Sequence, residues 1–181
     1  MTEAKKLRIC LAIVAALTLI IATMAYKFII AGSTGETHDG RVPVLLESAE
    51  RLFVLKEMRG LLSGVQQLSA ALARDDLASA ARLARSMGRE ADSAERATLM
   101  GKLPLAFKTM GLGVHADFDD MANRAESAAG TKVSSKELLL QLSGTLQKCV
   151  ACHAQFQLEL PPPAKSAQSG HSARIVASSG D

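Results

Sequence analysis

The sequence predicts an all-α protein in which one N-terminal transmembrane helix precedes an antiparallel four-helix bundle. Leu and Ala dominate, aromatic residues make up 3% of the chain and Trp is absent, a composition typical of helical proteins. From Pro43 to about Leu160 the apolar residues recur in steps of three and four, and we find no alternating apolar stretch that indicates a strand. Amphipathic helices with such short connections pack as an antiparallel bundle.

Composition also marks the ends of this helical region. The stretch from Gly32 to Gly40 is rich in turn-forming residues, and the chain after Leu160 is rich in Pro, Ser and Gly. The predicted segments are a membrane anchor or signal segment (1–31), a linker (32–42), a four-helix-bundle domain (43–160) and a disordered tail (161–181).

The N-terminal segment carries the signature of export. Three basic residues among the first eight precede an apolar run from Ile9 to Ala25, which continues beyond Lys27. A spanning helix needs about 20 apolar residues, and this run reaches that length if Lys27 snorkels to the interface. The basic flank predicts that the amino end lies in the cytoplasm and that everything after Gly32 lies on the far side.

A cleavable signal peptide is the alternative, with Thr23–Ala25 as its small-residue cleavage site. We prefer the anchor, because the apolar run is long for a signal peptide and resumes after Lys27. The expectation is therefore a domain in the periplasm that is anchored in the inner membrane, or a soluble periplasmic domain if the segment is removed.

The first two bundle helices are predicted from periodicity and capping residues. The first runs from about Pro43 to Ala73, with Pro43 in its first turn. The second begins at a cap on Asp75 or Asp76 and runs to about Leu99. The inward face of the first helix is predicted to comprise Leu55, Met58, Leu62, Val65, Ser69 and Leu72.

The third and fourth helices are predicted in the same way. The third runs from about Pro104 to Ala129, with a bend or break favoured at Gly111 and Gly113, and Gly130 ends it. The fourth begins at a capping box in which Ser134 is followed three residues later by Glu137. Its inward face comprises Leu139, Leu142, Leu146, Cys149, His153 and Phe156.

The stretch QKCVACHAQF, from Gln147 to Phe156, contains the residues with the most specific chemistry. On a helix, Cys149, Cys152 and His153 project from one face. The C-x-x-C-H pattern is typical of the attachment of c-type haem, in which the two thiols form thioethers with the haem and the imidazole binds the iron. We therefore predict one haem c, attached through Cys149 and Cys152, with His153 as iron ligand.

The sequence supports three other functions of these cysteines less well than haem attachment. A structural zinc site needs a fourth ligand, and the remaining cysteine, Cys10, lies in the apolar N-terminal run. A thioredoxin-like redox pair requires a βαβ context, which the sequence does not predict. A disulfide between Cys149 and Cys152 in mid-helix would be strained.

The CVACH motif on the last helix and the bundle layout resemble the cytochrome c′ family, the class II c-type cytochromes. The resemblance covers about Leu45 to Leu158 and implies an exported four-helix bundle with one haem near the end of its last helix. It further implies that the sixth iron position faces the first helix, behind an apolar side chain in high-spin members and bound by methionine in low-spin relatives. It also implies the option of a homodimer through the first two helices.

Two residues on the first helix compete for that position. In the register of the family, Leu55 would lie over the iron and leave it five-coordinate, whereas a shift of one turn would place Met58 there as the sixth ligand. Methionine ligation raises the reduction potential and suits electron transfer. Arg59 is a candidate partner for a haem propionate, because its planar fork pairs well with carboxylates. We expect His115 to be a boundary residue that pairs with Asp119.

These expectations favour a membrane-tethered monohaem cytochrome that carries single electrons between redox partner proteins. Under this interpretation the protein is an electron carrier and not an enzyme. The alternatives are a five-coordinate module that binds NO or CO, and a catalytic haem that would use His115 as its polar group. The net charge is +3 and the basic residues are dispersed, so no nucleic-acid partner is expected.

Overall fold

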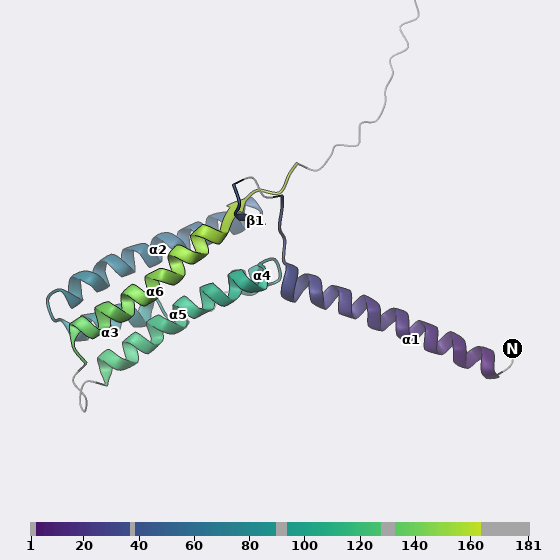
Figure 1. Cartoon of the computed structure of the whole chain (residues 1–181), viewed down its shortest axis with the longest axis horizontal. Helices are drawn as coiled ribbons and strands as arrows, with labels where there is room; N and C mark the ends of the chain where they lie inside the picture. Colours follow the sequence, from purple (N-terminus) through teal and green to yellow (C-terminus); the bar gives the residue numbers. More distant parts are fainter. Residues whose placement is uncertain (1–2, 37–38, 90–93, 128–132, 164–181) are drawn as a thin grey trace, which may run out of the picture.

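A computed structural model describes residues 3–36, 39–89, 94–127 and 133–163, and the fold is mostly helical (Figure 1). Most of the predicted tail, 164–181, lies outside these residues. The elements are α1 (Glu3–Ala25), a π-helical segment η1 (Tyr26–Ala31), β1 (Val42–Leu45), α2 (Ser48–Leu72), α3 (Leu77–Ser86), α4 (Ala94–Met100), α5 (Leu105–Glu126), α6 (Ser135–Gln155) and β2 (Phe156–Glu159).

Helices α2, α3, α5 and α6 share one hydrophobic core. Helix α3 packs against α2 and α5, and α6 packs against the same two helices. The largest fully buried side chains of this core come from different helices, so burial of their apolar surface holds the helices together. They are Leu68 and Leu72 of α2, Phe118 and Met121 of α5, and Leu138 of α6.

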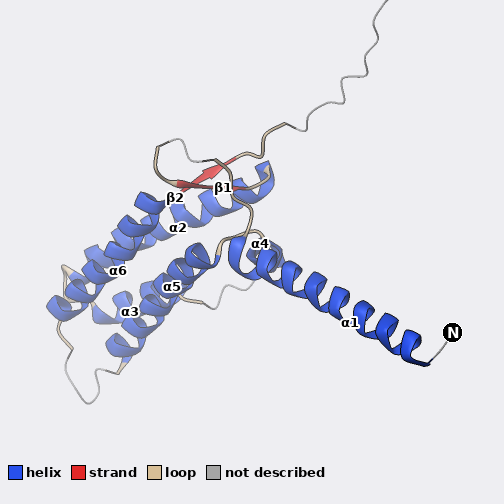
Figure 2. Ribbon diagram, turned by 45° about the vertical axis from the view of Figure 1, so that its right-hand side comes forward, coloured by secondary structure: helices blue, strands red, loops and turns tan. Residues whose placement is uncertain are grey.

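A second, smaller core lies around a pair of strands that the sequence did not predict. Strands β1 and β2 pair in parallel, with Val42 opposite Phe156 (Figure 2). Val44 and Phe156 are buried in a cluster with Leu99 and Leu103. The strands are only four residues long, and β1 is apolar throughout with no alternation, so periodicity does not reveal it. The pairing also joins segments more than 100 residues apart.

The predicted start of the first bundle helix, at about Pro43, is therefore too early. Pro43 lies in β1, and α2 begins at Ser48 after a capping box between Glu47 and Glu50. The predicted inward face is also wrong at one position, because Leu62 is 70% exposed and Leu61 packs against the core instead.

The second bundle helix is shorter than predicted. Asp76 caps α3 as expected, accepting a hydrogen bond from the Ser79 amide at 3.0 Å. The helix ends at Ser86, because the next two residues are held by other helices: Met87 packs on Gly64 of α2, and Gly88 lies against Asp119 with no room for a Cβ atom. The rest of the predicted helix corresponds to α4, and residues 90–93 lie outside the described residues.

The predicted break in the third helix does not occur. Helix α5 is continuous through Gly111 and Gly113, since its packing against α3 and α6 supports the helix despite the low helix propensity of glycine. Pro104 is its N-cap residue. The predicted terminator, Gly130, lies outside the described residues.

Helix α6 begins at the predicted capping box of Ser134 and Glu137. Leu142 and Cys149 of its predicted inward face lie in or against the main core, whereas the prediction is wrong by one residue at Leu139. Leu138 is fully buried whereas Leu139 is 39% exposed. Phe156 is not helical, because it is the first residue of β2.

The N-terminal helix leaves the helical body and contacts it only near its end (Figure 1). Together α1 and η1 form one helix of 29 residues, Glu3–Ala31, that is long and apolar enough to span a membrane, a criterion that a signal sequence also satisfies. Lys27 donates a hydrogen bond to the carbonyl oxygen of Gly32 at 2.7 Å, so this lysine interacts with the end of the helix.

Candidate functional site

The three residues of the C-x-x-C-H motif line one cavity of about 370 Å³ between α2, α5 and α6. Cys149 packs beside the main core and Cys152 beside the second core, so the cavity lies where the two cores meet. Helical spacing places all three side chains on the cavity side of α6, as the sequence predicted.

The opposite wall belongs to α2. The three residues predicted from the sequence, Leu55, Met58 and Arg59, all line the same cavity. Leu55 and Met58 are half-buried, whereas Arg59 is exposed at the rim and has no ion-pair or hydrogen-bond partner among the described residues. The structure therefore brings together every candidate site residue, and it places both Leu55 and Met58 within the cavity.

The third wall of the cavity was not predicted from the sequence. Helix α5 contributes Met110, Val114 and Phe118, which follow one another at intervals of four residues. The four-residue spacing is visible in the sequence. However, a break was expected at Gly111 and Gly113, so Met110 was not assigned to the same helix face as Val114 and Phe118. Leu62 and Leu146, both exposed, complete the apolar lining.

The apolar surroundings change the acidity of the two thiols. Burial raises the pKa of Cys149 and of Cys152 above the usual cysteine value, and for Cys152 the neighbouring Cys149 adds to the effect. Nucleophilic cysteines of redox motifs have a lowered pKa instead. The geometry therefore disfavours a thioredoxin-like dithiol, and both cysteines are free of disulfides.

The raised pKa values predict slow alkylation of the haem-free protein. Thiolate is the reactive form, so the iodoacetamide reaction of Cys149 and Cys152 should show a pH midpoint above the ordinary value of about 8.5. Peptide mass spectrometry, which separates these sites from Cys10, would measure the two rates. Unfolding in guanidinium chloride should return both midpoints to the ordinary value, and midpoints below it in the folded protein would contradict the structure.

His153 is exposed on the cavity rim and forms no hydrogen bond with another described residue. Both ring nitrogens are therefore accessible to a ligand. The nearby rim is held by an ion pair between Lys148 of α6 and Asp117 of α5, whose nitrogen and oxygen lie 2.6 Å apart. This partly exposed contact links α6 to α5 beside the motif.

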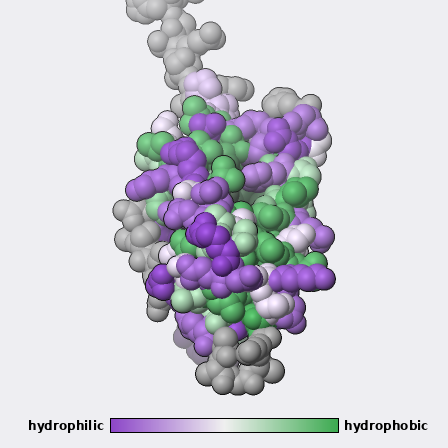
Figure 3. All heavy atoms as spheres, turned by 90° about the vertical axis from the view of Figure 1, so that its left-hand side faces the viewer, coloured by the Kyte–Doolittle hydropathy of each residue, from purple (hydrophilic) through white to green (hydrophobic). Residues whose placement is uncertain are grey.

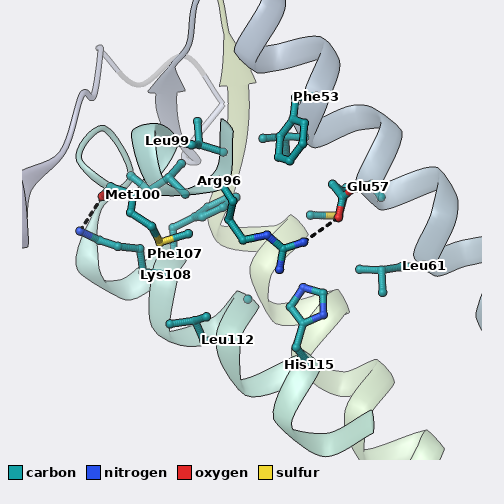
Figure 4. A pocket seen from close by; sticks show the side chains of 14 residues that line it. Phe53, Glu57, Leu61, Arg96, Leu99, Met100, Phe107, Lys108, Leu112 and His115 are labelled. Carbon is teal, nitrogen blue, oxygen red and sulfur yellow. Dashed lines mark hydrogen bonds and ion pairs between the residues drawn. The ribbon is translucent and has the colours of Figure 1, made fainter. Parts of the chain in front are cut away.

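A smaller cavity of about 90 Å³ adjoins the first and shares Met58, Leu61, Gly111 and His115 with it. Figure 4 shows that Arg96 of α4 extends into this space and meets Glu57 of α2, with a nitrogen–oxygen distance of 3.0 Å. The ring of His115 lies beside this pair. Arg96 was not predicted, because its place depends on how α4 packs over α2 and α5.

His115 does not pair with Asp119 as expected. Its Nδ1 lies 2.7 Å from the carbonyl oxygen of Met87, while Asp119 forms ion pairs with Arg85 and Arg89. A carbonyl oxygen only accepts hydrogen bonds, so Nδ1 carries the proton and Nε2 of the neutral ring keeps its lone pair. Among the described residues Nε2 of His115 has no hydrogen-bond partner, so it is available to a ligand or a proton.

No group of three or more His, Cys, Asp or Glu residues within the described part of the chain is arranged to hold a bare metal ion. Attachment of haem makes no such demand, because its thiols bond to the porphyrin rim and only one imidazole is needed at the iron. No protein-family model matches the chain, and neither a curated protein nor a solved structure is detectably similar to it.

Proposed function

We propose that the chain is a membrane-tethered monohaem c-type cytochrome of the cytochrome c′ kind, which carries single electrons on the periplasmic side of the inner membrane. The observation that carries this proposal is the shared cavity. Cys149, Cys152 and His153 face Met58 across a space lined mainly by apolar side chains. Helices α2, α3, α5 and α6 around one core agree with the four-helix bundle of that family.

The residues present fit a covalently bound haem. The cavity volume of about 370 Å³ lies within the range of roughly 300–1,000 Å³ that is usual for small-molecule sites. Two half-buried thiols and an accessible imidazole are available on one wall, and the guanidinium of Arg59, which has no partner in the described part of the chain, lies at the rim. An apolar lining with a few polar groups at its edge suits a flat, mostly apolar ring with charged propionates.

Each residue has a distinct role in this proposal. Cys149 and Cys152 hold the haem as thioethers, and His153 is the proximal iron ligand. Met58 is the sixth ligand from α2, and Arg59 pairs with a propionate. Bound haem supplies an iron that alternates between Fe(II) and Fe(III), and the apolar walls exclude water around it.

A five-coordinate module that binds NO or CO is the second candidate, because Leu55 lines the same cavity as Met58. With Leu55 over the iron, the sixth position would be open to a small gas molecule. The two candidates differ in the spin state of the iron and in the rate of CO binding.

The direct test is haem retention. Protein produced with a periplasmic haem-attachment system should carry one haem by intact mass, and that haem should survive acid–acetone extraction. Full-length protein should stay with the membrane after carbonate washing. Haem that is extracted, or that is absent, would exclude the proposed cofactor.

A further inference from the structure

The end of the membrane helix is packed directly onto the helical body. Gly32 adopts a φ of +66°, and a Cβ atom there would lie 2.5 Å from the Pro104 nitrogen and 2.6 Å from the Lys102 oxygen. The amide of Ser33 also donates a hydrogen bond to the Lys102 carbonyl oxygen at 2.6 Å. The chain after the helix runs directly against the backbone of residues 102–104. Only glycine at position 32 allows the two backbones to lie this close.

Lys108 strengthens the same junction from α5. Its Nζ lies 3.3 Å from the Phe28 oxygen, 3.0 Å from the Ile29 oxygen and 3.0 Å from the Met100 oxygen. These carbonyls lie at the C-terminal ends of η1 and α4, where a cation is electrostatically favoured. A flexible tether would have no such contacts.

Two of the three walls of the large cavity, α5 and α6, each have one end near this junction. Met110 is five residues after Leu105, the first residue of α5, a distance of about 7.5 Å along a helix. On the other side Ser33 accepts a hydrogen bond from the Leu45 amide at 2.8 Å, which joins the junction to β1. Strand β1 pairs with β2, which begins three residues after His153 (Figure 2).

The junction exposes large apolar side chains beside the basic side chains of Lys102 and Lys108. Exposed fractions are 54% for Phe28 and 42% for Ile30, both within the last turns of the N-terminal helix, and 42% for Leu105 at the start of α5. The end of the domain remote from α1 is a mosaic with many hydrophilic side chains (Figure 3). The junction end thus combines exposed apolar side chains with lysines, a combination that suits a surface of lipid headgroups.

We propose that residues 26–34 and the loop before α5 form a rigid mount, which holds the cavity end of the domain on the lipid headgroups. The inference rests on the membrane-anchored form of the proposed function, but it does not depend on the haem. One consequence is that a redox partner must reach the cavity at the membrane surface.

The test uses the full-length protein in phospholipid nanodiscs that contain a gadolinium-chelating headgroup lipid. Amide NMR signals broaden with proximity to the headgroups. A rigid mount predicts strong broadening at Leu105 and at Leu158, which pairs with Val44 beside the junction, and none at the remote Ala73. Weak, uniform broadening across the domain would show that the domain moves freely and would overturn the proposal.

Two pairs of variants test whether the junction contacts produce the broadening gradient. Gly32→Ala should abolish the broadening gradient, whereas Gly40→Ala should keep it, because Gly40 also has a positive φ of +89° but has no atom near the Cβ position. Lys108→Met should weaken the gradient, and Lys136→Met, at an exposed site near the remote end, should not. An unchanged gradient in both junction variants would refute the mount.

The same measurement on the variant with both Cys149 and Cys152 changed to serine separates this inference from the cofactor. A gradient in that haem-free protein supports the mount whether or not the wild type carries haem. Haem in the wild type together with uniform broadening would retain the proposed function and reject the mount.

Discussion

Replacing Cys149 and Cys152 together by serine is expected to abolish covalent haem attachment while the helices remain folded. Serine has nearly the same shape as cysteine, but its hydroxyl forms no thioether with the haem. Haem staining of denaturing gels and the pyridine haemochrome spectrum would measure the loss. Circular dichroism would report helix content, which should stay close to that of the haem-free wild type.

The third cysteine provides the matched control. Cys10 is exposed on α1, remote from the cavity, so Cys10→Ser should leave haem attachment unchanged. Either single change at the motif should leave one thioether and a shifted haem absorption band. Covalent haem in the double variant would show that attachment uses other residues.

Replacing Met58 is expected to change the sixth ligand of the iron. Wild-type protein should be low-spin, with a weak near-infrared sulfur-to-iron band when oxidised. Met58→Ala should abolish that band, lower the reduction potential, and give either a high-spin iron or a complex with His115. The direction of the potential follows from the loss of a soft thioether, which favours Fe(II).

Leucine at the same position separates ligation from packing. Met58 is half-buried beside the second core, and a swap that conserves volume usually costs less than about 1.5 kcal/mol. Met58→Leu should therefore keep the fold and lose the sulfur band.

Met110 is the matched control, because it lines the same cavity from α5. Met110→Leu should keep the band, and its loss there would identify α5 as the source of the ligand. A wild-type protein that is already high-spin and binds CO rapidly would favour Leu55 over the iron and the gas-binding alternative.

The free nitrogen of His115 explains why it is the expected replacement ligand. Its Nδ1 proton is held by the Met87 carbonyl oxygen, so Nε2 of the neutral ring has an available lone pair. His115 also lines both cavities, as Met58 does. In the double variant Met58→Ala/His115→Ala, the low-spin fraction should disappear.

Much of the candidate site was predictable because it is local. Cys149, Cys152 and His153 share one face of any helix with their spacing, and the capping box of Ser134 and Glu137 sets where α6 begins. The burial of Leu138 in place of Leu139 was not predictable, since both residues are leucine and only packing against other helices distinguishes them.

The sequence by itself determined the helical class, the apolar N-terminal helix and the common helical face of the motif residues, because periodicity, length and residue spacing are properties of short segments. Only the tertiary structure decided that α3 ends at Ser86, that β1 pairs with β2, and that Gly32 packs against residues 102–104. Each of these depends on contacts between segments far apart in the chain, where buried area and close approach outweigh local propensity.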